Sequence, residues 1–122
     1  MNRASGVTLG AVLLLSVACA GVGKVHYSSL VAINRPARSA EQVDTFLTQR
    51  PSRPYQEIGI LTYRAGTAEQ YVDVVQYMRQ KAAQLGADGI IMMGSKSGPS
   101  MPVGYVIATM TDYQAMAIVY KD

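Results

Sequence analysis

The chain has a single cysteine, a single histidine and no tryptophan. One cysteine cannot form a disulfide within the chain. The histidine, His26, has no partner nearby in the sequence that could complete a metal site, so we expect an ordinary surface residue. Neither a GxGxxG nor a GKS/T pattern follows a predicted strand, which argues against a nucleotide-binding loop. The lack of these residues and motifs predicts a protein that is not an enzyme and that needs no cofactor.

An excess of one charge sign is also lacking. Eleven basic and eight acidic residues give a formal net charge of +3, and loss of Arg3 with a signal segment would leave +2. Such a small surplus does not favour nucleic acid as a partner. Four arginines nevertheless flank residues 41–47, and we interpret them either as contacts to phosphate-rich lipid head groups or another anionic partner, or as ordinary solvated side chains. They are Arg35, Arg38, Arg50 and Arg53.

A hydrophobic run long enough to span a membrane is missing as well. After Arg3, the apolar run from Val7 to Ala18 has about a dozen residues, whereas a spanning helix needs roughly twenty. A short apolar run behind a positive charge is typical of a signal peptide, which we predict over residues 1–18.

Cys19 lies where this signal should be cleaved. The small residue before it resembles the lipobox of bacterial lipoproteins, although Leu15 lies one position before the usual place of the leucine. We therefore expect acylation of Cys19, for example with palmitate, and a polar tether over residues 19–29. If Cys19 is acylated, the chain resembles lipoproteins whose second residue, here Ala20 rather than aspartate, directs them to the outer membrane, facing the periplasm. The alternative is cleavage after Ala20, which would release a soluble periplasmic protein.

The segment after residue 66 predicts a helix. Thr67 and Gln70 have the spacing of a capping box, so the helix should begin at Thr67. Gly86 can adopt the left-handed conformation that ends a helix. Apolar residues recur between them at intervals of three and four, which predicts one buried face. They are Tyr71, Val74, Val75, Met78, Ala82 and Leu85.

Strands are predicted on both sides of this helix, at residues 55–63 and 89–94. The second contains four consecutive apolar residues, a pattern typical of a strand buried on both faces. A strand, a helix and a strand form a βαβ unit, whose strands pair in one sheet through a right-handed crossover. They should lie either as neighbours or with one strand between them.

Further strands are predicted at residues 28–33 and 41–47, although Ser39 and Gln42 could instead start a short helix. Residues 95–102 read as a mobile surface loop. Residues 103–110 and 113–121 are predicted to form a closing antiparallel hairpin. The expected fold is one α+β domain over residues 30–122, with a mixed sheet of five or six strands and one long helix on one face.

The order of these segments resembles a family of small, mostly uncharacterised bacterial envelope lipoproteins. The resemblance covers about residues 40 to 121 and rests on Val43, on RPYQEIG (53–59), on RQKAAQLGADGIIM (79–92) and on AMAIVYK (115–121). It implies an envelope location, a helix stop at Gly86 and a hydrogen bond from Asp88 to the turn after the helix. The chain is more distantly similar to the lipoprotein that senses envelope stress for the Rcs phosphorelay. That sensor depends on disulfides, so the resemblance does not carry the sensor role to this chain.

These observations predict a non-catalytic structural or interaction module, held at the membrane by its lipid anchor, with an envelope protein of unknown identity as partner. A homo-oligomer is expected if the second face of the sheet is apolar and open, and the positions to inspect are Tyr105, Ile107, Ile118 and Tyr120. The predicted interaction surface comprises Arg35, Arg38, Arg50, Arg53, Tyr105 and Tyr120.

The alternative function is a periplasmic copper-binding protein. Thioethers suit Cu(I), and five methionines fall in the last third of the chain. Most of them lie on predicted strands, where methionine commonly fills a core. They are Met92, Met93, Met101, Met110 and Met116.

Overall fold

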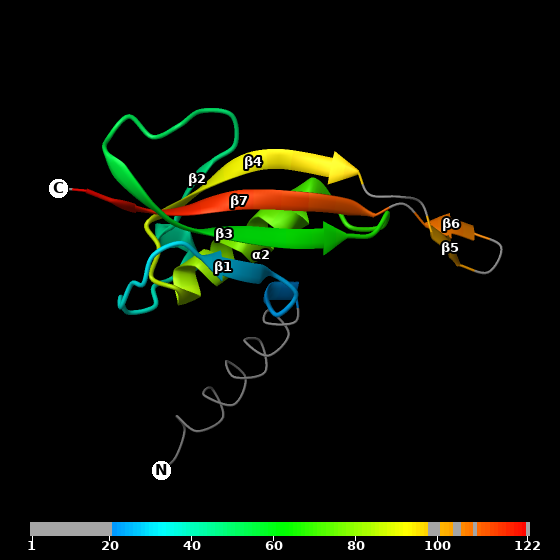
Figure 1. The fold of residues 1–122 in the computed structure, drawn as a ribbon, viewed down its shortest axis with the longest axis horizontal. Coiled ribbons are helices and arrows are strands. Elements are labelled where there is room, and N and C mark those ends of the chain that lie inside the picture. The colour runs from blue at the N-terminus through cyan, green and yellow to red at the C-terminus, as the bar shows by residue number, and fades with distance from the viewer. Residues whose placement is uncertain (1–20, 98–100, 104–105, 109, 122) are drawn as a thin grey trace, which may run out of the picture.

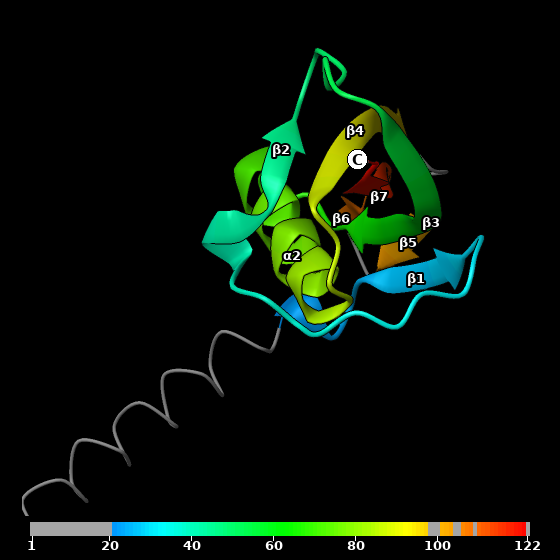
Figure 2. The same ribbon diagram turned by 90° about the vertical axis from the view of Figure 1, so that its left-hand side faces the viewer.

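The computed structural model describes residues 21–97, 101–103, 106–108 and 110–121. A five-stranded mixed sheet in the order β1-β3-β7-β4-β2 carries one long helix, α2, against one face (Figures 1 and 2). A second sheet of two short strands, β5 and β6, lies beyond the ends of β4 and β7 (Figure 1). This confirms the predicted α+β class. No helix among the described residues is long and apolar enough to cross a membrane.

Strand β7 (Thr111–Tyr120) is the centre of the sheet. It pairs antiparallel with β3 (Tyr55–Ala65) on one side and with β4 (Gly89–Ser97) on the other. The strands on either side of the helix are therefore parallel and separated by one strand, which is the second of the two predicted arrangements. Four consecutive residues of β7, 115–118, are buried, as a strand with neighbours on both edges requires.

Helix α2 (Tyr71–Gln84) ends as predicted, with Gly86 at a φ of +77°. Its predicted start at Thr67 is wrong, because Gln70 is the residue that precedes the first helical turn. Glu69 closes a competing turn: its N–H donates to the Gly66 carbonyl at 3.2 Å, and its carboxylate accepts hydrogen bonds from the Gly66 N–H and the Tyr63 hydroxyl.

The predicted buried face of α2 is largely confirmed. Three of its members are buried in the core and two more pack against it, but Tyr71 is exposed. Tyr71 occupies the first position of the helix, where its ring lies 5.6 Å from the ring of Tyr113 on β7. The buried members are Val74, Met78 and Ala82, and the partly buried ones are Val75 and Leu85.

The two edge strands are short. β2 (Asp44–Phe46) runs parallel to β4, and the 3-10 helix η1 (Ala40–Gln42) precedes it with a capping box between Ser39 and Gln42. The two alternatives predicted for this segment therefore both occur, one after the other. β1 (His26–Ser29) pairs antiparallel with β3, so the predicted strand over residues 28–33 begins earlier and ends sooner.

The predicted tether over residues 19–29 is wrong from residue 21 onward. Val22 and Val25 are only 4% and 5% exposed, and Val25 belongs to the core. Tyr27 on β1 donates its hydroxyl to the Ile58 carbonyl at 3.0 Å. Its ring also covers Gly59, where a Cβ would come within 2.3 Å of it. The folded domain therefore includes residues 21–29, because their apolar side chains are needed to close the core.

The C-terminal third contains a hairpin as predicted, but its strands differ. β5 (Met101–Val103) pairs with β6 (Val106–Ala108), while β7 pairs with β3 and β4 rather than with residues 103–110. The predicted loop over residues 95–102 is also partly wrong, because β4 extends to Ser97 and β5 starts at Met101. β4 gains this length by continuing to pair with β7 past an irregularity between Met92 and Gly94.

Candidate functional site

The candidate site is a hollow of about 640 Å³ at the end of the sheet where β4 begins and β7 ends, and we call it the arginine hollow. Three arginines and two aspartates meet there with few apolar groups. The lining residues are Arg35, Arg38, Gln42, Asp44, Arg53, Asp88, Val119 and Tyr120. Counting ionised side chains, the lining has one more positive than negative charge.

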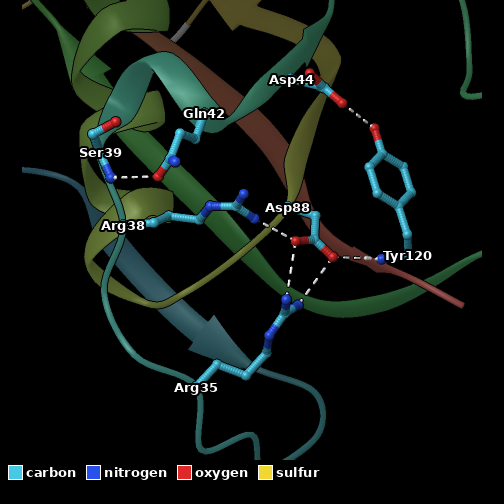
Figure 3. Close-up of polar contacts among 7 residues, drawn as sticks. All are labelled: Arg35, Arg38, Ser39, Gln42, Asp44, Asp88 and Tyr120. Carbon is cyan, nitrogen blue, oxygen red and sulfur yellow. Dashed lines mark hydrogen bonds and ion pairs between the residues drawn. The ribbon is translucent and has the colours of Figure 1, made fainter.

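Asp88 is the residue on which these contacts converge (Figure 3). The turn after α2 places it directly before β4, and it accepts two hydrogen bonds from the Arg35 guanidinium, both at 3.0 Å. A third comes from Arg38, and the backbone N–H of Tyr120 donates a fourth at 2.8 Å. The sequence predicted a bond to the turn of residues 86–87 instead. That prediction is wrong, because the carboxylate is used to join the 35–38 segment to the ends of β4 and β7.

The charge of Asp88 is set by these neighbours. Its side chain is 13% exposed, and burial alone would raise its pKa. Hydrogen bonds from Arg35, the Tyr120 N–H and Arg38 outweigh burial and hold the pKa below its ordinary value. The bond to Asp88 in turn raises the pKa of Arg35. Asp88 and Arg35 therefore both remain ionised at neutral pH.

Tyr120 links the other two charged groups of the hollow. Its hydroxyl donates to Asp44 at 2.5 Å, and the guanidinium carbon of Arg53 lies 4.0 Å from the centre of its ring. Burial, together with the bond to Asp44, raises the pKa of Tyr120 to about 12, so the hydroxyl keeps its proton at neutral pH. Arg53 takes part in none of the salt bridges found among the described residues. Its contact with Tyr120 is a cation–π interaction, which holds the group in place without neutralising it.

The structure brings together four of the six residues predicted to form an interaction surface. Arg35, Arg38, Arg53 and Tyr120 all line the arginine hollow. Arg50 does not, because it lines a separate hollow of about 280 Å³ beside β4. Tyr105 lies outside the described residues, as do the predicted signal peptide and Cys19.

Sequence reasoning missed the other four residues of the hollow, Gln42, Asp44, Asp88 and Val119, and with them the central role of Asp88. Arg35 and Asp88 are 53 positions apart, and no short-range pattern in the sequence can indicate a contact between residues so far apart. The one available signal was the placement of Asp88 between a helix stop and a buried strand, a position where a polar side chain lies at the end of the sheet.

The residues predicted for other roles lie apart from this site. His26 is exposed on β1 and lines a hollow of about 470 Å³ with Lys24, Arg64 and Asp112. Ile118, a candidate for a second apolar face, is fully buried, and the side chain of Ile107 lies outside the description.

No group of three or more His, Cys, Asp or Glu side chains within the described ranges could hold a metal. The methionines also lie in different environments. Met92 is buried in the core, Met93 is 52% exposed, and Met116 is buried opposite Ile91 in the register of β7 and β4. Met110 is half-buried, and the side chain of Met101 lies outside the description. These positions do not favour the copper alternative.

Comparisons with known proteins agree with the fold and leave the function open. No protein-family model matches the chain, and no curated protein sequence matches it. Among solved structures, it is similar to the crystal structure of a Francisella virulence factor, FvfA, with a TM-score of 0.54 and 17% sequence identity. The match covers 81% of this chain and 98% of that chain. At this identity, the likeness shows a shared fold alone.

Proposed function

We propose that this chain is a non-catalytic envelope lipoprotein, anchored in the outer membrane through Cys19 and facing the periplasm, that binds a protein partner in the arginine hollow. The anchor is supported by the signal-like segment before Cys19 and by the resemblance to small envelope lipoproteins. The contact surface is supported by one observation above all. Arg53 is held over Tyr120 at 4.0 Å, in a hollow that it shares with two further arginines.

The chemistry of the hollow favours a carboxylate-bearing segment of a protein. Arginine presents five N–H donors in a rigid fork that matches a carboxylate. Asp88 fixes Arg35 and Arg38 before any partner arrives, and Tyr120 does the same for Arg53. Such preorganisation lowers the entropy cost of binding. Val119 is the one apolar aliphatic side chain among the lining residues, so the hollow is poorly suited to an apolar small molecule.

The anchor is tested by the intact mass and the membrane fractionation of the mature protein beside a Cys19→Ala variant. We expect a mature N-terminus at Cys19 with added acyl mass, and loss of membrane association in the variant. A mature chain that begins at Gly21 in the soluble fraction would contradict the anchor and leave a soluble periplasmic protein.

The contact surface is tested with a photo-crosslinking amino acid at Gln42, which lines the hollow. In whole cells, we expect a defined crosslinked product that is lost in Arg53→Glu, because the reversed charge repels a carboxylate. Arg50→Glu is the matched control: it makes the same change outside the hollow, and the product should persist. A product that survives Arg53→Glu, or that both variants lose equally, would contradict the assignment.

A further inference from the structure

The start of the described chain is packed tightly against the domain. A Cβ at Gly21 would come within 2.3 Å of the Tyr77 ring on α2, so the backbone lies directly against that ring. The N–H of Lys24 donates to the Gly21 carbonyl at 3.2 Å, and the N–H of Val25 donates to the Val22 carbonyl at 3.1 Å. Residues 21–25 are therefore part of the folded domain and cannot act as a flexible linker.

This packing limits how far the domain can be from an anchor at Cys19. Two residues of fully extended chain span at most about 7 Å, whatever conformation they adopt. The acyl chains of a lipoprotein start at the level of the head groups. If Cys19 is acylated, as the proposed function requires, the turn at residues 21–25 must lie at the bilayer surface.

The turn shares one side of the molecule with β1 and with the segment that follows it, residues 30–36. In Figures 1 and 2 these parts lie along the same side, and β4 lies on the opposite side. We call this side, formed by residues 21–36, the anchor-proximal face. It carries an exposed apolar side chain, Leu30, which is 54% exposed.

The charge of this face suits an anionic surface. Within residues 21–36 the sequence contains one lysine, one arginine and the histidine, and no aspartate or glutamate. The arginine, Arg35, lines the arginine hollow, where it pairs with Asp88, whereas Lys24 belongs to none of the salt bridges among the described residues. Asp112, the acidic group in the hollow beside Lys24 and His26, is already paired with Arg64. Lys24 is therefore available to lipid phosphates.

We propose that the anchor-proximal face binds directly to the surface of an anionic phospholipid bilayer, with Lys24 at the phosphates and Leu30 in the interface. The domain then has one fixed orientation on the membrane and does not swing on a tether. Lys24 precedes β1 and Leu30 follows it, so the face offers a basic and an exposed apolar residue at the two ends of one strand. Peripheral segments bind anionic lipid through such a combination of charge and apolar surface.

The test uses the processed, full-length lipoprotein in vesicles of phosphatidylcholine and phosphatidylglycerol. Acylation consumes the thiol of Cys19, so a single introduced cysteine can be labelled specifically with a fluorophore. Leu30→Cys reports on the proposed face, and Met93→Cys on β4 is the matched control, because the two side chains are apolar and nearly equally exposed, at 54% and 52%. A lipid with a quencher near its head group reports contact with the bilayer.

We expect several-fold stronger quenching at position 30 than at position 93. Lys24→Glu should reduce the quenching at position 30, whereas Lys96→Glu, the same change on β4, should leave it unchanged. Equal quenching at both positions, or none at either in protein that carries the acyl mass, would overturn the orientation and leave the anchor intact. Absence of the acyl mass would remove the anchor itself, and the inference with it. A face that is quenched only when an envelope protein is added would be a protein interface, which would also overturn the proposal.

Discussion

Asp88 accepts hydrogen bonds from three residues in two other parts of the chain: Arg35, Arg38 and the backbone of Tyr120. Its own backbone continues this role, since its N–H donates to the Ile118 carbonyl at 2.9 Å and its carbonyl accepts from the Asp44 N–H at 3.0 Å. One residue thus joins β2, β7 and the segment before η1. Its carboxylate holds the arginine hollow together.

Asp88→Asn should lower the free energy of unfolding at neutral pH by about 2 kcal/mol, the scale of hydrogen bonds between charged groups. The change leaves Arg35 and Arg38 facing an amide that cannot balance their charge. Because the folded pKa of Asp88 is depressed, its stabilisation is fully present above the unfolded pKa, whose usual value is 3.8, and is lost as the pH falls through the folded value. Denaturant unfolding followed from pH 7 downward should therefore show a flatter acid limb in the variant.

The matched control is Asp112→Asn, which removes the carboxylate of the exposed Arg64–Asp112 pair. Solvent screens such a pair, so the stability should change little. An Asp88→Asn variant as stable as this control, with an unchanged acid limb, would show that the Asp88 network does not stabilise the fold.

At the scale of elements, the end of α2 could be predicted from neighbouring residues, whereas the strand partners of β7 could not. The end of α2 at Gly86 follows from its left-handed conformation, which the neighbouring residues set. The predicted start at Thr67 is wrong because the Glu69 carboxylate accepts hydrogen bonds from Gly66 and from Tyr63, a residue on β3. The pairing of β7 with β3 and β4, in place of a hairpin with residues 103–110, depends instead on partners far along the chain.

In the arginine hollow, too, local sequence indicated the group of residues, whereas contacts between distant residues could not be predicted. The four linker arginines could be recognised as a group from their spacing, and Tyr120 was selected with them. Which of the arginines meet is decided by Asp88 and Tyr120, which are far from the arginines in the sequence. Arg50 was therefore grouped with the others in the sequence, yet it lies beside β4 and outside the hollow.

For the molecule as a whole, the arginine hollow and the anchor-proximal face are parts of one folded unit. The segment that leaves β1 runs along the face and then supplies Arg35 and Arg38 to the hollow. The N–H of Arg38 also donates to the Ala83 carbonyl at the end of α2, at 2.9 Å. A domain that lies flat on the bilayer would therefore hold the hollow near the head groups, where a membrane-bound protein partner can reach it.

Because these parts form one folded unit, the structure can be tested by removing the first residues of the domain. A chain that starts at Leu30, as the predicted tether would permit, should fail to unfold cooperatively, whereas a chain that starts at Gly21 should do so. The shorter chain loses the buried Val22 and Val25, each contributing about 1.5 to 3 kcal/mol, and also β1 with its Tyr27 contact over Gly59. A small domain has about 5 to 15 kcal/mol of net stability, so this loss is a large part of the total. Urea unfolding followed by circular dichroism compares the two chains. Equal midpoints would show that residues 21–29 are a tether after all, and would remove the basis for a fixed orientation on the membrane.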